Sequence, residues 1–95
     1  MMGKCVKLIR WTSHAFDNLS EREVGREEAE KTLADPEVIA PSQSGRSLFM
    51  RRYFDNVLGK EMLLIIVVED TEVERVVVTV FKTSQISKYL KETGL

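Results

Sequence analysis

The fold of this chain of 95 residues is decided by its longest uninterrupted apolar stretch, Met62-Leu-Leu-Ile-Ile-Val-Val68. A strand over this stretch is apolar on both faces, which is typical of a central strand that is covered on both sides or flanked by a partner. The stretch is far shorter than the roughly 20 apolar residues of a membrane-spanning helix. We therefore expect a sheet built around residues 62–68, and we expect no membrane as a partner.

Two segments with alternating side chains flank this stretch and predict two more strands. Ser47–Phe54 is the first, and its alternation places the consecutive Arg51 and Arg52 on opposite faces of the sheet. Arg75–Phe81 is the second, and it returns antiparallel after a short hairpin. Its alternation divides its side chains between two faces, with Val76, Val78 and Val80 on one and Val77, Thr79 and Phe81 on the other. The predicted turns cover Asp55–Lys60 and Asp70–Glu72.

The N-terminal part of the chain predicts a strand followed by a helix. Val6–Trp11 alternates like a strand, and Thr12 or Ser13 then offers an oxygen that can cap a helix over Ser13–Arg22. The residues expected to face inward on this helix are Ala15, Phe16 and Leu19. The residues expected on one flank, away from the apolar stripe, are His14, Asn18 and Arg22.

A second helix, an edge strand and a final helix complete the predicted elements. The second helix covers Arg26–Ala34 and ends at Asp35-Pro36, since proline disfavours a helical residue before it. Val38–Ala40 is predicted as a short edge strand, and Pro41–Gly45 has the composition of a loop. The last helix is expected over Ser84–Lys91.

In order, these elements are a strand, two helices, a meander of three or four antiparallel strands, and a short C-terminal helix. The order predicts an α+β fold in which the N-terminal strand and the helices pack on a mainly antiparallel sheet of four or five strands, with the helices against one sheet face. Residues 1–95, of which 43% are hydrophobic, fit one domain.

The composition of the chain indicates its cellular compartment and limits the classes of partner that it is expected to bind. The single cysteine, Cys5, excludes an intramolecular disulfide and favours the cytoplasm. The net charge of −1 argues against a dedicated nucleic-acid-binding domain, which usually carries a basic excess. Charge is nevertheless uneven, because residues 36–60 hold four cations and two carboxylates. This segment permits one basic face, and its candidates for contact with a nucleic acid are Arg46, Arg51 and Arg52.

The best chemical lead is the only histidine, His14, at the expected start of the first helix. Histidine has an unperturbed pKa near neutrality and suits acid-base catalysis, although a lone histidine here is also an ordinary half-buried packing residue. One histidine and one cysteine far apart in sequence do not form the clustered ligands of a metal site. If the chain is an enzyme, we therefore expect it to work without a metal ion or an organic cofactor.

Several weak motifs occur in an order that carries a family resemblance. They are Thr12-x-His14-Ala15, a basic residue at Arg22, Leu33-Ala34-Asp35-Pro36, Gly45-Arg46, Arg51-Arg52-Tyr53, and Val78-Thr79-Val80-Phe81-Lys82-Thr83-Ser84. The chain thereby resembles an uncharacterised prokaryotic domain family that is similar to a distant branch of the RelE-type toxins, small ribonucleases of toxin-antitoxin systems. The resemblance extends from about residue 8 to about residue 90.

The resemblance implies a metal-independent endoribonuclease in which the 2′-hydroxyl of RNA attacks the adjacent phosphate. Such a reaction needs a base, an acid and cations over the phosphate oxygens, and its implied partners are RNA, the ribosome and a small antitoxin protein. We expect the site residues to converge on a shallow cleft between the first helix and the sheet. Their implied roles are His14 as base or acid, Arg22 and one of Arg51 or Arg52 as phosphate clamps, and Lys82 or Tyr89 as a supporting group.

Two alternatives of a different class remain open. A non-catalytic module of the same fold, which binds a protein or a nucleic acid, is favoured by the acidic net charge and by Asn18, where the family often has a second arginine. In that case Arg22 pairs with neighbouring carboxylates, and the tyrosines are packing residues. A homodimer that exchanges strand edges is the other alternative, for which we expect exposed aromatic side chains at Phe49, Tyr53 and Phe81.

Overall fold

The computed structural model describes residues 8–92 of the chain. Cys5 and the first two residues of the predicted strand Val6–Trp11 lie outside the described residues. The elements in chain order are β1 (Leu8–Trp11), α1 (Ser13–Glu21), α2 (Arg26–Ala34), β2 (Val38–Pro41), the 3-10 turn η1 (Gln43–Gly45), β3 (Arg46–Asp55), β4 (Lys60–Asp70), β5 (Glu74–Thr83) and α3 (Ile86–Glu92). None of these helices is long and apolar enough to cross a membrane.

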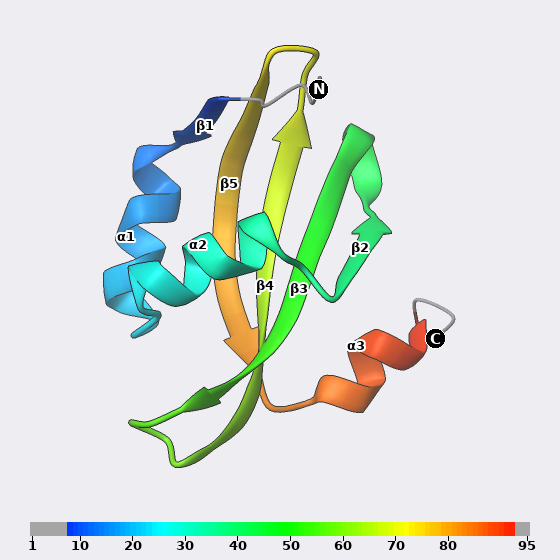
Figure 1. The fold of residues 1–95 in the computed structure, drawn as a ribbon. Coiled ribbons are helices and arrows are strands. Elements are labelled where there is room, and N and C mark those ends of the chain that lie inside the picture. Colours follow the sequence, from blue (N-terminus) through cyan, green and yellow to red (C-terminus); the bar gives the residue numbers. More distant parts are fainter. Residues whose placement is uncertain (1–7, 93–95) are drawn as a thin grey trace, which may run out of the picture.

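The five strands form one mixed sheet in the order β1-β5-β4-β3-β2. Strands β2 to β5 are antiparallel neighbours, whereas β1 lies parallel to β5 with Leu8 opposite Glu74. The central position of β4 agrees with its apolar composition, because Met62–Ile66 is buried throughout. Figure 1 shows this arrangement, with α1 beside β5 and α2 crossing the sheet over β4 and β3. The predicted α+β fold is confirmed.

The meander strands are longer than the sequence predicts at both ends. β3 reaches Asp55, which pairs with Lys60 at the start of β4, and Asp70 at the end of β4 pairs with Arg75. Polar residues at strand ends carry no hydrophobic alternation, so the pattern underestimates the length of strands whose last pairs are polar.

The first hydrophobic core lies between one face of the sheet and helices α1 and α2. Its buried residues are Ala15, Val24, Ala29, Leu33, Phe49, Leu64, Ile66, Val68, Val77 and Val80, with Trp11, Leu19 and Tyr53 packed against them. We call this face of the sheet the α1/α2 face. Phe49 is only 2% exposed, and the Arg75 guanidinium lies over its ring at 4.8 Å. The expectation of an exposed Phe49 at a dimer edge is therefore wrong.

The second core lies on the opposite face of the sheet, which α3 covers in part. Met50, Leu63 and Ile65 are buried there, and Tyr89 and Leu90 of α3 pack against them together with Phe81. We call this the α3 face. The expectation that all helices pack on one sheet face is wrong, because adjacent residues of β4 are apolar on both sides and the second side also requires cover.

A register shift in the β4–β5 pair changes which valines of β5 share a face. Val67 pairs with Thr79 but Val68 pairs with Val77, so Val78 is an extra residue in β5. This bulge brings Val77 and Val80 into the same core, whereas strict alternation predicts them on opposite faces. A bulge adds one residue to a period of two, and every side chain beyond it changes face.

Candidate functional site

A polar cluster on the α1/α2 face joins three strand residues to the loop that follows α1. The Lys82 ammonium donates to Asp55 Oδ2 at 2.7 Å and to the Glu23 carbonyl at 3.0 Å. The Tyr53 hydroxyl donates to the same Asp55 oxygen at 3.0 Å. The side chains of Lys82 and Asp55 are only 11% and 5% exposed. The cluster is thus a buried ion pair supported by a phenol.

Asp55 also holds the turn between β3 and β4. Its Oδ1 accepts the backbone N–H groups of Val57 and Leu58, both at 3.0 Å. The hydrogen bond from Lys82, with those from Leu58 and Tyr53, lowers the pKa of the Asp55 carboxyl to about 2. Burial, followed by the hydrogen bond to Asp55, raises the pKa of the Tyr53 phenol. At neutral pH the cluster therefore contains an ionised Asp55 and a protonated Tyr53.

Sequence reasoning assigned Asp55 only to a turn and missed its place in this cluster. A local signal was present, because an aspartate that opens a turn often accepts backbone N–H groups two and three residues later. Lys82 was identified from the family resemblance alone, and no local signal connects it with Asp55, which lies 27 residues earlier. The contact exists because β3 and β5 flank β4 on the same sheet.

Arg22 and Asn18 both bind the backbone of Val80 in β5. Asn18 Oδ1 accepts the Val80 N–H at 3.0 Å, and the Arg22 guanidinium donates to the Val80 carbonyl at 3.0 Å. β1 pairs with β5 only as far as Val77, so these side chains satisfy backbone groups on the part of β5 that β1 does not reach. Arg22 therefore caps a strand edge in this structure.

Two expectations about α1 are wrong. Asn18 is fully buried, although we expected it on a polar flank. Phe16 is 42% exposed, although we expected it to face inward. Phe16 stacks on Trp11, with ring centroids 5.3 Å apart. Asn18 faces β5 because the Val80 N–H on the open strand edge needs a hydrogen-bond acceptor. The spacing of apolar residues in the sequence does not predict this contact.

Arg51 and Arg52 lie on opposite faces, as the strand alternation predicts. Arg51 points to the α1/α2 face and pairs with Glu28 at 3.4 Å. Arg52 makes two hydrogen bonds from its guanidinium to the carboxylate of Glu37, at 2.9 and 3.1 Å. These bonds and the Arg52 backbone N–H lower the pKa of the Glu37 carboxyl to about 2. Each arginine thus has a carboxylate partner.

The remaining predicted site residues lie apart from this cluster. His14 is exposed in the first turn of α1, eight residues and therefore about 12 Å of helix from Arg22. The His14 side chain makes no hydrogen bond or ion pair with any of residues 8–92. Tyr89 packs against Phe81 on the α3 face, with ring centroids 6.4 Å apart. Arg46 begins β3 opposite Glu69, and its Nε is buried without a hydrogen-bond partner.

The predicted site residues are consequently divided between regions of the sheet. Arg22, Arg51 and Lys82 share the α1/α2 face, whereas Arg52 and Tyr89 belong to the α3 face. The α1/α2 group has the cations for binding an anion, but its lysine and Arg51 already hold carboxylates. Within residues 8–92, no three histidine, cysteine, aspartate or glutamate side chains are grouped so that they could hold a metal ion.

No protein-family model, no curated protein and no solved structure matches this chain.

Proposed function

We propose that this chain is a RelE-like module that binds another protein in the cytoplasm without cleaving RNA. The observation that carries this proposal is the exposure of large apolar side chains in two groups. The segments that carry them, at the start of β1 and β5 and in the β3–β4 hairpin, lie at opposite ends of the sheet (Figure 1). The first group is Leu8, Ile9 and Val73 at the start of β1 and β5, where the Leu8 N–H donates to the Val73 carbonyl. The second group is Phe54, Val57 and Leu58 on the β3–β4 hairpin.

Both groups belong to parts of the chain that other contacts hold in place. The hairpin group sits on the turn that Asp55 stabilises, and the β1 group sits on a strand that pairs with β5 over four residues. Ordered apolar side chains at the surface mark sites of protein interaction, because burying them against a partner removes them from water at little conformational cost.

The charges of the structure also support a protein as the partner. Six cationic side chains each lie within 3.4 Å of a carboxylate oxygen: Arg10, Arg26, Arg51, Arg52, Arg75 and Lys82. These pairs leave few open donors for the many phosphates of a nucleic acid, and the net charge of −1 supplies no long-range attraction for a polyanion.

The second candidate function is the metal-independent endoribonuclease that the RelE-type resemblance implies. The observation that favours it is the presence of Arg22, Arg51 and Lys82 on one face of the sheet, with Arg22 at the end of α1 and Lys82 bound to the nearby Glu23 carbonyl. In this alternative the cations stabilise the phosphate oxygens while His14 exchanges a proton with a ribose hydroxyl. RNA, the ribosome and an antitoxin protein are then the partners.

Cleavage of RNA separates the two candidates. The purified chain and His14→Ala are incubated with labelled RNA, alone and with ribosomes, and RNA binding is measured at rising salt. We expect no cleavage and only weak binding, since few phosphate contacts are available. Cleavage by the wild type that is lost in His14→Ala would establish the ribonuclease and refute the module.

A positive test of the module uses photo-crosslinking amino acids at Leu8 and Phe54. Lys31, an exposed residue of α2, is the matched control position. We expect a polypeptide that crosslinks at Leu8 or Phe54 but not at Lys31, and that binds the purified chain when it is itself purified. Crosslinks distributed equally over the three positions, with no binding between purified components, would contradict the proposal.

A further inference from the structure

The edges of this sheet are protected unequally. An edge strand presents unpaired N–H and C=O groups that can pair with another chain, and proteins usually block such edges with proline, charge or covering elements. On β5, the part beyond β1 is covered by α1, whose Asn18 and Arg22 bind the Val80 backbone. On β2, the edge strand has four residues and ends in Pro41, which has no N–H to donate.

Among the described residues, no helix covers the outer edge of β1, and no proline interrupts this strand. Its inner hydrogen bonds to β5 begin with the Leu8 N–H to Val73 and end with the Thr12 N–H to Val77. In a parallel ladder only alternate residues of a strand bond to a given neighbour. The backbone groups of Ile9 and Trp11 therefore point away from β5 and out of the sheet.

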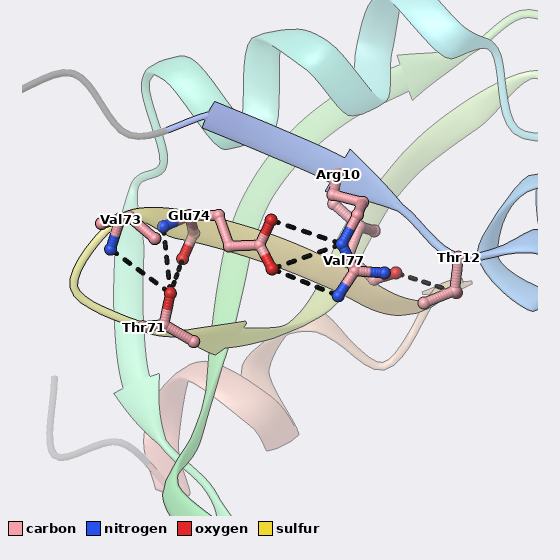
Figure 2. Close-up of polar contacts among 6 residues, drawn as sticks. All are labelled: Arg10, Thr12, Thr71, Val73, Glu74 and Val77. Atoms are coloured by element: carbon pink, nitrogen blue, oxygen red, sulfur yellow. Dashed lines mark hydrogen bonds and ion pairs between the residues drawn. The ribbon is translucent and has the colours of Figure 1, made fainter.

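The side chains of β1 leave this edge accessible. Leu8 is 74% exposed and Ile9 is 50% exposed, so apolar surface lies beside the unpaired backbone groups. Thr12 fixes the end of the strand, since its hydroxyl donates to the Val77 carbonyl at 2.9 Å (Figure 2). The edge is thus both apolar and held in a strand conformation.

A cation flanks β1 on each face of the sheet. Arg10 donates to the Glu74 carboxylate through its Nε and one Nη (Figure 2). Its other Nη makes no hydrogen bond to the described residues. On the α1/α2 face, the Arg26 guanidinium lies over the Trp11 ring at 5.7 Å and bonds to Glu30 through Nε alone.

From these observations we propose that the outer edge of β1 accepts an extended strand of another protein, in which two neighbouring apolar residues adjoin two neighbouring acidic ones, so that each face of the strand carries one of each kind. Its backbone pairs with Ile9 and Trp11, its apolar side chains cover Leu8 and Ile9, and its carboxylates bind the open sides of Arg10 and Arg26. This inference rests on the proposed protein-binding function and names its surface and the chemistry of its partner.

The test uses synthetic peptides and the natural reporter of this strand. Trp11 is the only tryptophan, so its fluorescence reports binding at β1 without a label. The probe is a capped eight-residue peptide that repeats two valines followed by two glutamates. One control peptide carries lysine in place of glutamate, and a second carries N-methyl groups at alternate amides, which removes strand pairing but keeps the side chains.

We expect the acidic peptide to change Trp11 fluorescence in a saturable manner and to protect the Ile9 and Trp11 amides from hydrogen exchange. The N-methylated and lysine peptides should each bind at least about tenfold more weakly. Ile9→Glu should weaken binding by a similar factor, whereas Ile39→Glu should not. Ile39 is the matched control, because it is 55% exposed on the opposite edge strand.

Three results with the peptides and variants would overturn the inference. They are the absence of saturable binding by the acidic peptide, equal binding by the N-methylated peptide, and equal loss of binding in Ile39→Glu. A dimer in sedimentation that Ile9→Glu dissociates would also overturn it, because a second copy would then occupy the edge. The peptide controls remain informative even where a variant fails to fold. Binding of a purified partner through Phe54 alone would refute this edge and leave the proposed function intact.

Discussion

Shortening Ile66 to alanine measures how much the α1/α2 core contributes to folding. Ile66 is fully buried in the central strand and packs in the core that α1 and α2 cover. Removing three buried carbons from an isoleucine costs about 2 to 5 kcal/mol, which includes the cavity left behind. For a domain of this size each kcal/mol lowers the melting temperature by roughly 4 to 8 °C. We therefore expect Ile66→Ala to melt at least about 8 °C below the wild type.

Ile39→Ala and Ile65→Ala are the two control variants for this experiment. Ile39→Ala removes the same atoms from a side chain that is 55% exposed, so its effect on the urea midpoint should be much smaller. Ile65 is equally buried but faces the α3 core. Hydrogen exchange should therefore rise first in α3 for Ile65→Ala and first in α1 and α2 for Ile66→Ala. Equal urea midpoints for Ile66→Ala and Ile39→Ala would refute the central position of β4.

Two further predictions concern the polar contacts of the α1/α2 face. Arg22→Met keeps the aliphatic stem but removes the donor to the Val80 carbonyl. We therefore expect the free energy of unfolding, measured with urea, to fall by about 0.5 to 1.5 kcal/mol. An unchanged midpoint would show that the edge needs no cap. The hydrogen bond from Lys82 is the chief cause that lowers the pKa of the Asp55 carboxyl from 3.8 to about 2. The ionised Asp55 therefore contributes to stability above pH 3.8, and this contribution is lost as the pH falls toward 2. Asp55→Asn should therefore flatten the pH dependence of the urea midpoint in that range, and a slope equal to that of the wild type would contradict the contact with Lys82.

The division of the predicted site residues bears on the ribonuclease alternative. Arg52 and Tyr89 lie on the α3 face, whereas Arg22 and Lys82 lie on the α1/α2 face. Groups on the two faces cannot act on one phosphate, because a packed sheet separates them. A ribonuclease built on this chain would therefore use Arg51 in preference to Arg52.

The sequence was sufficient for the kinds of elements, their order and the central strand. Burial in strands and helices repeats with periods of 2 and 3.6 residues, so local spacing reports it directly. The same alternation placed Arg51 and Arg52 on opposite faces, and the structure agrees. The resemblance to the RelE-type family and the roles that it implies remain predictions.

Only the tertiary structure decided which distant polar groups meet and which face each helix covers. The Lys82–Asp55 pair spans 27 residues, and the contact from Arg22 to the Val80 carbonyl spans 58. Such contacts depend on strand order, on the bulge at Val78 and on the need to satisfy the uncovered edge of β5. These features follow from the free energy of the whole packed domain, in which most buried polar groups find a partner, and local periodicity carries no information about them.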